Sequence, residues 1–221
     1  MAELERPPSL TALVTEHVRN MIVRGQVPLG ASISERSISA ELKVSKTPVR
    51  EALAQLRNEG LVTIVPQSGV RVFTLSSREV RAICAFRRVT ETAALHFAMA
   101  ENAGQLLADL ERIEREMLRA LGDGDVRRYL DLDTAFHLAF FAHCGNPYLQ
   151  NAYGLYVGKI AALRTHLAGR PQHTSLSLAE HTQIVAAVRD RDMARLSAIL
   201  DAHLARTQET YEIGVEDISK D

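Results

Sequence analysis

The sequence is short of several residue types and patterns, and each shortage excludes a class of protein. It has no tryptophan, few aromatic residues and only two cysteines, Cys84 and Cys144, in 221 residues. Both cysteines fall inside apolar helical patterns, which favours a reducing compartment over a disulfide framework. No secretory leader is visible, and no apolar run approaches the roughly 18 residues that a membrane helix requires. We therefore expect a cytoplasmic protein with no membrane partner.

A strong excess of charge of one sign is also missing, because the net charge is −1. Residues 1–75 hold nine Lys/Arg and seven Asp/Glu, whereas the remaining residues hold 17 and 20, and seven of the eight histidines lie in this second part. A chain of 221 residues with 46% hydrophobic content is large enough for two domains with real cores. The uneven histidines indicate that the two parts have different chemistry.

Residues 1–75 are typical of a winged helix-turn-helix. Three short helices are predicted, over residues 9–24, 34–42 and 45–60; Gly25 ends the first, Pro48 lies in the first turn of the third, and Gly60 ends it. The stretches "LVTIV" and "VRVFTL" then alternate as strands do and flank "PQSG", residues 66–69, which is predicted to be a hairpin tip. In such a unit the third helix enters a major groove of double-stranded DNA while the wing reaches neighbouring phosphates or the minor groove.

The third predicted helix has one polar and one apolar side. Lys46 and Arg50 lie four residues apart on the polar side, whereas Val49, Leu53 and Leu56 face inward. This spacing suits DNA contacts, but a solvated helix face would also carry such residues.

The order of these motifs resembles the DNA-binding domain of the GntR family of bacterial transcriptional regulators over residues 24–72. "VSKTPVREAL", then "EGLV" and a glycine-tipped wing, carry the resemblance. Most relatives have arginine at Lys46 and glycine at Lys43; lysine cannot make the planar two-point contact to guanine, which favours a phosphate contact for Lys46. The resemblance implies DNA-contact roles for Arg36, Ser45, Lys46, Thr47, Arg50 and Gly69.

Residues 76–221 are predicted to form a six-helix antiparallel bundle, so the fold class is mainly α. Ser76 and Glu79 have the spacing of a capping box that opens a long first helix. Glycine, proline and aspartate then break the helical pattern five times, and the short connections favour antiparallel neighbours. The breaks lie at residues 102–104, 122–124, 145–147, 169–171 and 190–192.

Polar residues on the apolar faces of these helices are candidate ligands. Asp133 and His137 share a face with three aromatic residues, and His181 and His203 each lie on an apolar stripe about equally far from the turn near Asp190. Antiparallel packing therefore brings the two histidines to the same level. One carboxylate and three imidazoles suit a divalent first-row metal, zinc before nickel, manganese or iron. A core histidine can instead be only hydrogen-bonded.

The pattern "D-x-x-F-H", "G-N-P", "E-H" and "H-L" resembles the FCD effector-binding domain of FadR-type GntR regulators. Six helices rather than seven resemble the VanR-like subgroup. The resemblance implies that Asp133, His137, His181 and His203 hold a metal, and that a small organic acid binds in the same cavity.

Two arginines are candidates for binding the effector. Arg87 lies four residues before Glu91 on an apolar face, so it can contact an effector carboxylate or pair internally with Glu91. Arg164 lies near the inner side of its helix and is the second candidate. The remaining histidines, His96, His143, His166 and His173, are expected to be ordinary polar or surface residues.

These features predict a homodimeric transcriptional regulator, a repressor, whose winged helices each read half of a pseudo-palindromic operator. A small carboxylate beside the metal would control its affinity for DNA. Two alternatives stay open: a regulator for which the metal is itself the signal, and a metalloenzyme. No catalytic residue is predicted, because no further acidic residue stands out as a general base near the ligands.

Overall fold

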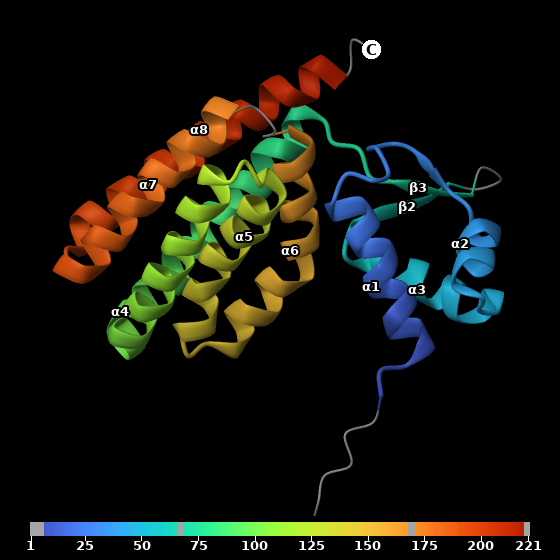
Figure 1. The fold of residues 1–221 in the computed structure, drawn as a ribbon, viewed down its shortest axis with the longest axis horizontal. Coiled ribbons are helices and arrows are strands. Elements are labelled where there is room, and N and C mark those ends of the chain that lie inside the picture. Colours follow the sequence, from blue (N-terminus) through green and yellow to red (C-terminus); the bar gives the residue numbers. More distant parts are fainter. Residues whose placement is uncertain (1–6, 66–68, 168–170, 219–221) are drawn as a thin grey trace, which may run out of the picture. The chain divides into compact units, whose positions relative to one another are not determined.

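The computed structural model describes residues 7–65, 69–167 and 171–218 (Figure 1). It divides into two compact units, residues 1–74 and 75–221. Eight helices and three strands occur within the described residues. In the described part of the chain, no helix combines the length and apolar character needed to cross a membrane.

The first unit is a winged helix-turn-helix. Its helices are α1 (Leu10–Val23), α2 (Glu35–Leu42) and α3 (Lys46–Asn58), and its strands are β1 (Ser32–Ile33), β2 (Val62–Val65) and β3 (Gly69–Val72). The inward face of α3 is buried as predicted, with Val49, Leu53 and Leu56 at most 2% exposed. Hydroxyls of Ser9 and Ser34 cap α1 and α2.

The strands form an antiparallel sheet in the order β1-β3-β2. β2 and β3 are the predicted wing strands, paired from Val62 opposite Val72 to Val65 opposite Gly69. β1 was not predicted, because two residues are too short to show an alternating pattern; it pairs through Ile33 opposite Val70. Residues 66–68 of the predicted hairpin tip lie outside the described residues.

The turn between α2 and α3 is made by Lys43, the position where most members of the resembled family carry glycine. Lys43 has φ 53° and ψ 40°, in the left-handed region, and its amide bonds back to the carbonyl of Ser39. A side chain in this region costs about 1–2 kcal/mol because its Cβ crowds the backbone. Lys43 therefore adopts the conformation that this turn requires at an energetic cost.

The second unit is a bundle of α4 (Ser77–Gly122), α5 (Val126–His143), α6 (Pro147–Leu167), α7 (Pro171–Asp190) and α8 (Met193–Ile218) (Figure 1). The capping box at Ser76 is confirmed, since its hydroxyl accepts from Glu79 N and the Glu79 carboxylate accepts from Ser76 N. The first predicted break is a kink rather than a loop: Asn102 leaves helical geometry, so α4 contains two helical segments. The bundle thus has the six predicted helical segments.

The core of this unit combines aliphatic residues from the bundle helices with buried aromatic rings, among them Tyr129, Phe136 and Phe140. Polar groups interrupt this core where α4, α5, α6, α7 and α8 face each other. These groups include four buried residues with formal or potential charge on α4 and α5, which are Arg87, Glu91, Asp133 and His137. Their burial requires partners, since an unpaired charge in an apolar interior is very costly.

Candidate metal and effector site

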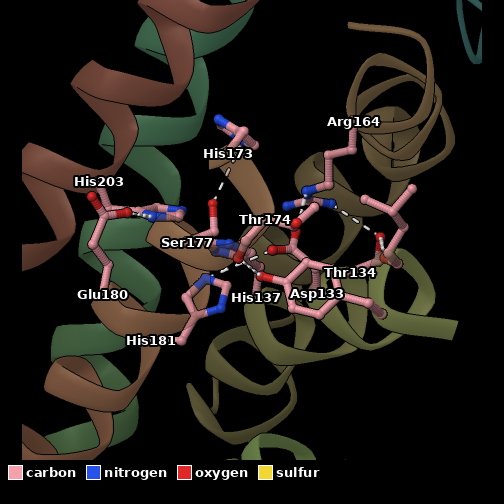
Figure 2. A network of polar contacts seen from close by, with 12 residues as sticks. Asp133, Thr134, His137, Arg164, His173, Thr174, Ser177, Glu180, His181 and His203 are labelled. Carbon is pink, nitrogen blue, oxygen red and sulfur yellow. Dashed lines mark hydrogen bonds and ion pairs between the residues drawn. The ribbon is translucent and has the colours of Figure 1, made fainter. Parts of the chain in front are cut away.

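Three imidazoles from three helices meet in the core of the helical unit (Figure 2). His137 comes from α5, His181 from α7 and His203 from α8, and each is at most 2% exposed. Their ring centroids are 4.9 to 5.3 Å apart, and one nitrogen of each ring lies within 4.8 Å of the others. The tight turn at Arg191 folds α8 back along α7, which places His181 and His203 at one level.

Asp133 lies one helical turn before His137 and borders the cluster (Figure 2). Its Oδ2 forms an ion pair with Arg164 Nε at 2.5 Å, whereas its Oδ1 lies 3.8 Å from His181 Nε2. One carboxylate oxygen therefore faces a guanidinium and the other faces the imidazoles. The structure brings together all four residues predicted as metal ligands.

Two glutamates contact the Nδ1 side of two of the rings. Glu91 Oε2 lies 2.8 Å from His137 Nδ1 at a poor hydrogen-bond angle, and Glu180 Oε2 lies 2.6 Å from His203 Nδ1. A carboxylate at Nδ1 favours the tautomer with its proton there, which leaves Nε2 as the free donor atom for a metal. These two contacts had no sign in the sequence, which offered no acidic residue besides Asp133 as an obvious neighbour of the ligands.

Both glutamates are also held by arginines. Arg87 Nε donates to Glu91 Oε1 at 2.7 Å, and Arg206 Nε donates to Glu180 Oε1 at 2.7 Å. The ion pair that was one of the two predicted roles of Arg87 is thus present. Burial opposes ionisation of Glu180, but hydrogen bonds from Arg206 and His203 lower its pKa to about 2. A carboxylate held in this way is a poor proton acceptor.

Burial decides the charge of the imidazoles. It lowers the pKa of His137 and His203 to about 4 and that of His181 to about 3, despite nearby carboxylates. Burial also favours the neutral acid of Asp133, but the Arg164 guanidinium and the neighbouring imidazoles together outweigh it and hold the pKa of Asp133 below its usual range. At neutral pH the cluster therefore presents three neutral imidazoles and one carboxylate, the forms that bind metals.

Several buried nitrogens of this cluster have no hydrogen-bond partner within the described part of the chain. They are His137 Nε2 and both ring nitrogens of His181. Buried polar atoms are nearly always satisfied in native proteins, so convergent orphans of this kind indicate a missing ligand. Imidazole nitrogens beside a carboxylate oxygen form a donor set that fits a divalent first-row metal.

A small cavity of about 10 Å³ lies beside the cluster, with room for about one water. Arg87, Arg164 and Tyr211 all line it, and each keeps one buried donor without a hydrogen-bond partner among the residues described. These donors are Arg87 Nη2, Arg164 Nη2 and Tyr211 Oη. The Asp133 carboxylate lines the same cavity, but all three of these unsatisfied groups can donate a hydrogen bond, so they suit an anion.

His173 also lines this cavity, although the sequence analysis placed it among ordinary polar or surface residues. Its side chain is half-buried, and its Nδ1 lies 2.9 Å from Arg206 Nη1 and 3.1 Å from Thr210 Oγ1. The first turn of α7 packs against α8 here, which periodicity within α7 cannot reveal. Figure 2 shows His173 and Ser177 beside the cluster.

The predicted DNA contacts gather at the start of α3, on α2 and at the wing. Arg36, Ser45, Lys46, Thr47, Arg50 and Gly69 are all exposed. Arg50 Nε donates to Glu35 Oε2 on α2 at 2.9 Å. This ion pair joins α3 to α2 and positions the Arg50 guanidinium.

Comparison with known proteins matches both units. The family model "Bacterial regulatory proteins, gntR family" matches residues 10–72, and the FCD domain model matches residues 82–206, more than half of the chain. The chain belongs to the GntR family, with an FCD domain. It is therefore a DNA-binding transcriptional regulator of the GntR/FCD type. The VanR-like subgroup stays a prediction.

Relatives of this GntR chain include named repressors. The HTH-type transcriptional repressor GlaR of Escherichia coli K12 is 30% identical, over 85% of this chain and 89% of its own length. The gluconate operon transcriptional repressor of Bacillus subtilis 168 is 24% identical, over 90% and 84%. Matched families and relatives are regulators rather than enzymes, which supports the regulator over the metalloenzyme.

Solved structures show the same fold. Escherichia coli McbR/YncC aligns with a TM-score of 0.81 at 21% identity, over 93% of this chain and 98% of that protein. A GntR regulator from Rhodococcus sp. RHA1 aligns with a TM-score of 0.82 at 20% identity, over 92% and 98%.

Proposed function

We propose that this GntR regulator is a homodimeric repressor, controlled by a small carboxylate that binds beside a divalent metal in the FCD domain. The observation that carries the proposal is the convergence of two unsatisfied sets of groups on one place. Imidazole nitrogens that have no hydrogen-bond partner among the described residues suit a cation, and guanidinium and phenol donors that likewise have none there suit an anion.

Asp133, His137, His181 and His203 would hold the metal, with zinc the first candidate and nickel, manganese or iron the others. Glu91 and Glu180 would orient two of the rings through their Nδ1 atoms. A divalent ion there would supply a fixed positive charge to which an effector oxygen can bind.

Arg87 and Arg164 would contact the effector through their free Nη2 groups. Because the cavity has room for only about one water, an organic acid must displace side chains to enter. This displacement supplies a physical route from ligand to protein conformation. Effector and DNA would then alter each other's affinity by the same factor.

Each winged helix would read half of a pseudo-palindrome. Lys46 would contact a phosphate and Arg50 a base edge or phosphate, together with Arg36, Ser45, Thr47 and the wing at Gly69. Replacing Lys46 with Met should weaken binding on all sequences and reduce the salt dependence of log K by about one unit of slope. Arg57→Met, an exposed substitution at the far end of α3, is the charge-matched control.

A fluorescence anisotropy titration tests the whole proposal, with DNA from the regulator's own promoter region as the probe. We expect salt-sensitive, sequence-preferring binding by a dimer, weakened by a carboxylate only when metal is present. The absence of sequence preference would refute the proposal.

Asp133→Ala and His137→Ala test the role of the helical unit independently of DNA binding by the winged helix. Both substitutions should lower bound metal, measured by elemental analysis, and abolish the response to carboxylates. DNA affinity in the absence of effector should stay at the wild-type value, because neither residue lies in the winged helix. If metal alone changes DNA affinity and no carboxylate adds to it, the ion is itself the signal and the effector part of the proposal fails.

A further inference from the structure

The charges buried around the metal cluster balance each other before any ligand is added. Arg87 pairs with Glu91, and Arg164 pairs with Asp133, and all four side chains are at most 7% exposed. At the rim of the site, Arg206 pairs with Glu180. Histidines must be neutral to bind a metal, so the three imidazoles add no charge.

A divalent ion would disturb this balance by its full charge. Usually a metal site offsets part of that charge, because thiols or imidazolium groups lose protons as the ion binds. Here the only anionic ligand, Asp133, already lies in an ion pair with Arg164, so its charge is already balanced. The occupied interior would therefore carry two uncompensated positive charges in a medium where unpaired charge is costly.

The donors that have no hydrogen-bond partner among the described residues come from three different helices. Arg87 Nη2 and Tyr211 Oη come from α4 and α8, whereas Arg164 Nη2 comes from α6, beside Asp133 and the imidazoles. The Nε of each guanidinium already pairs with a carboxylate of the protein. The two guanidinium groups belong to different helices, so each of two acceptor groups on one ligand could have a guanidinium donor of its own.

We infer that the effector is a dicarboxylate, whose two negative charges balance the bound divalent ion and whose two ends are held by Arg87 and Arg164. This inference rests on the proposed metal and carboxylate site and narrows its ligand class. Monocarboxylates would leave one positive charge unbalanced and one set of donors unsatisfied.

Isothermal titration of the full chain with succinate and with succinamate tests the inference. Succinamate keeps the length and shape of succinate but replaces one carboxylate with an amide. With zinc present at a buffered free concentration, succinate should bind about 10- to 100-fold more tightly, the factor of one charge-assisted hydrogen bond. In metal-free protein the preference should collapse toward unity, because the interior is then already neutral.

Substitution of Arg87 gives a second, independent readout. Arg87→Met removes one buried positive charge, so the zinc-loaded protein should lose its preference for succinate over succinamate. Arg88→Met, at an exposed position next in sequence, should keep the wild-type preference. Since the Arg87 variant can misfold, the comparison of the two ligands on wild-type protein decides the inference without it.

The outcomes separate this inference from the proposed function. Equal binding of succinate and succinamate to the zinc-loaded protein would overturn the dicarboxylate alone. Tighter binding of inorganic phosphate or sulfate than of succinate would also overturn it, in favour of one doubly charged head group. Failure of every carboxylate to bind, with or without zinc, would overturn the proposed effector site and this inference together.

Discussion

Replacing Arg164 with Met should destabilise the metal-free helical unit by about 3–5 kcal/mol. The substitution keeps most of the side-chain volume but leaves Asp133 as a buried carboxylate without its cation, the situation for which this cost is typical. Both partners of the pair are at most 7% exposed, so solvent does not screen the loss. The Thr134 hydroxyl also loses its hydrogen bond from Arg164 Nη1.

Urea unfolding followed by tyrosine fluorescence measures this cost. All five tyrosines lie in the helical unit, so the signal reports on that unit alone: Tyr129, Tyr148, Tyr153, Tyr156 and Tyr211. Arg112→Met, which removes exposed ion pairs with Asp109 and Glu116, should change the free energy of unfolding by less than about 1 kcal/mol.

The pH dependence supplies the sign of the effect. In the wild type Arg164 depresses the folded pKa of Asp133, so the pair contributes stability above the unfolded pKa of about 3.9 and loses it as the pH falls below. Without Arg164, the largest opposition to burial is lost and the pKa of Asp133 rises. As the pH falls, protonation of Asp133 then removes the unpaired buried charge from the variant. The difference in unfolding free energy between the wild type and the variant should therefore decrease.

Added zinc should also reduce the difference in unfolding free energy between the wild type and Arg164→Met, because the ion supplies Asp133 with a new positive partner. An unfolding free energy of metal-free Arg164→Met within about 1 kcal/mol of the wild type would refute the reasoning. A gap that widens as the pH falls would also contradict it.

Three further substitutions test other parts of the structure. Glu180→Gln should weaken metal binding about 10- to 100-fold in a chelator competition, because the carboxylate orients His203; exposed Glu209→Gln is the control, and unchanged affinity would contradict the role. Lys43→Gly should slow hydrogen exchange of α2 and α3 amides about two- to fivefold, because glycine relieves the left-handed strain; faster exchange would count against that strain. Gly214→Ala should lower the free energy of unfolding by about 1–3 kcal/mol in urea, since a Cβ there would lie 3.0 to 3.3 Å from Leu167 atoms, including Cα. Gly104→Ala, at an exposed position, is the control. If Gly214→Ala stabilises the protein, α6 can shift to accommodate the added methyl group.

Much of the fold could be read from local patterns. The wing strands, the capping box at Ser76 and the breaks between helices depend on residues a few positions apart, so sequence periodicity and turn residues reveal them. The strand at Ser32–Ile33 could not be predicted. Its structure comes from pairing with β3, about 40 residues later, rather than from any preference of its own two residues.

The candidate site divides in the same way. Asp133 and His137 are one helical turn apart, and His181 and His203 flank one short turn at similar distances, so their convergence followed from helix geometry. The contacts of Glu91 with His137, of Glu180 with His203 and of His173 with Arg206 were missed, because each depends on the rotation of one helix against another. Glu180 is next to His181 in sequence, yet its carboxylate contacts His203 on α8.

By itself, the sequence determined the two kinds of domain and the four candidate metal ligands, because periodicity, caps and family motifs are properties of neighbouring residues. Only the tertiary structure decided which charge meets which. It paired Asp133 with Arg164 and Glu91 with His137, and it brought donors on three helices to one cavity. Helix packing sets these pairings, because the interior must satisfy every charge it buries with whatever group the neighbouring helix presents.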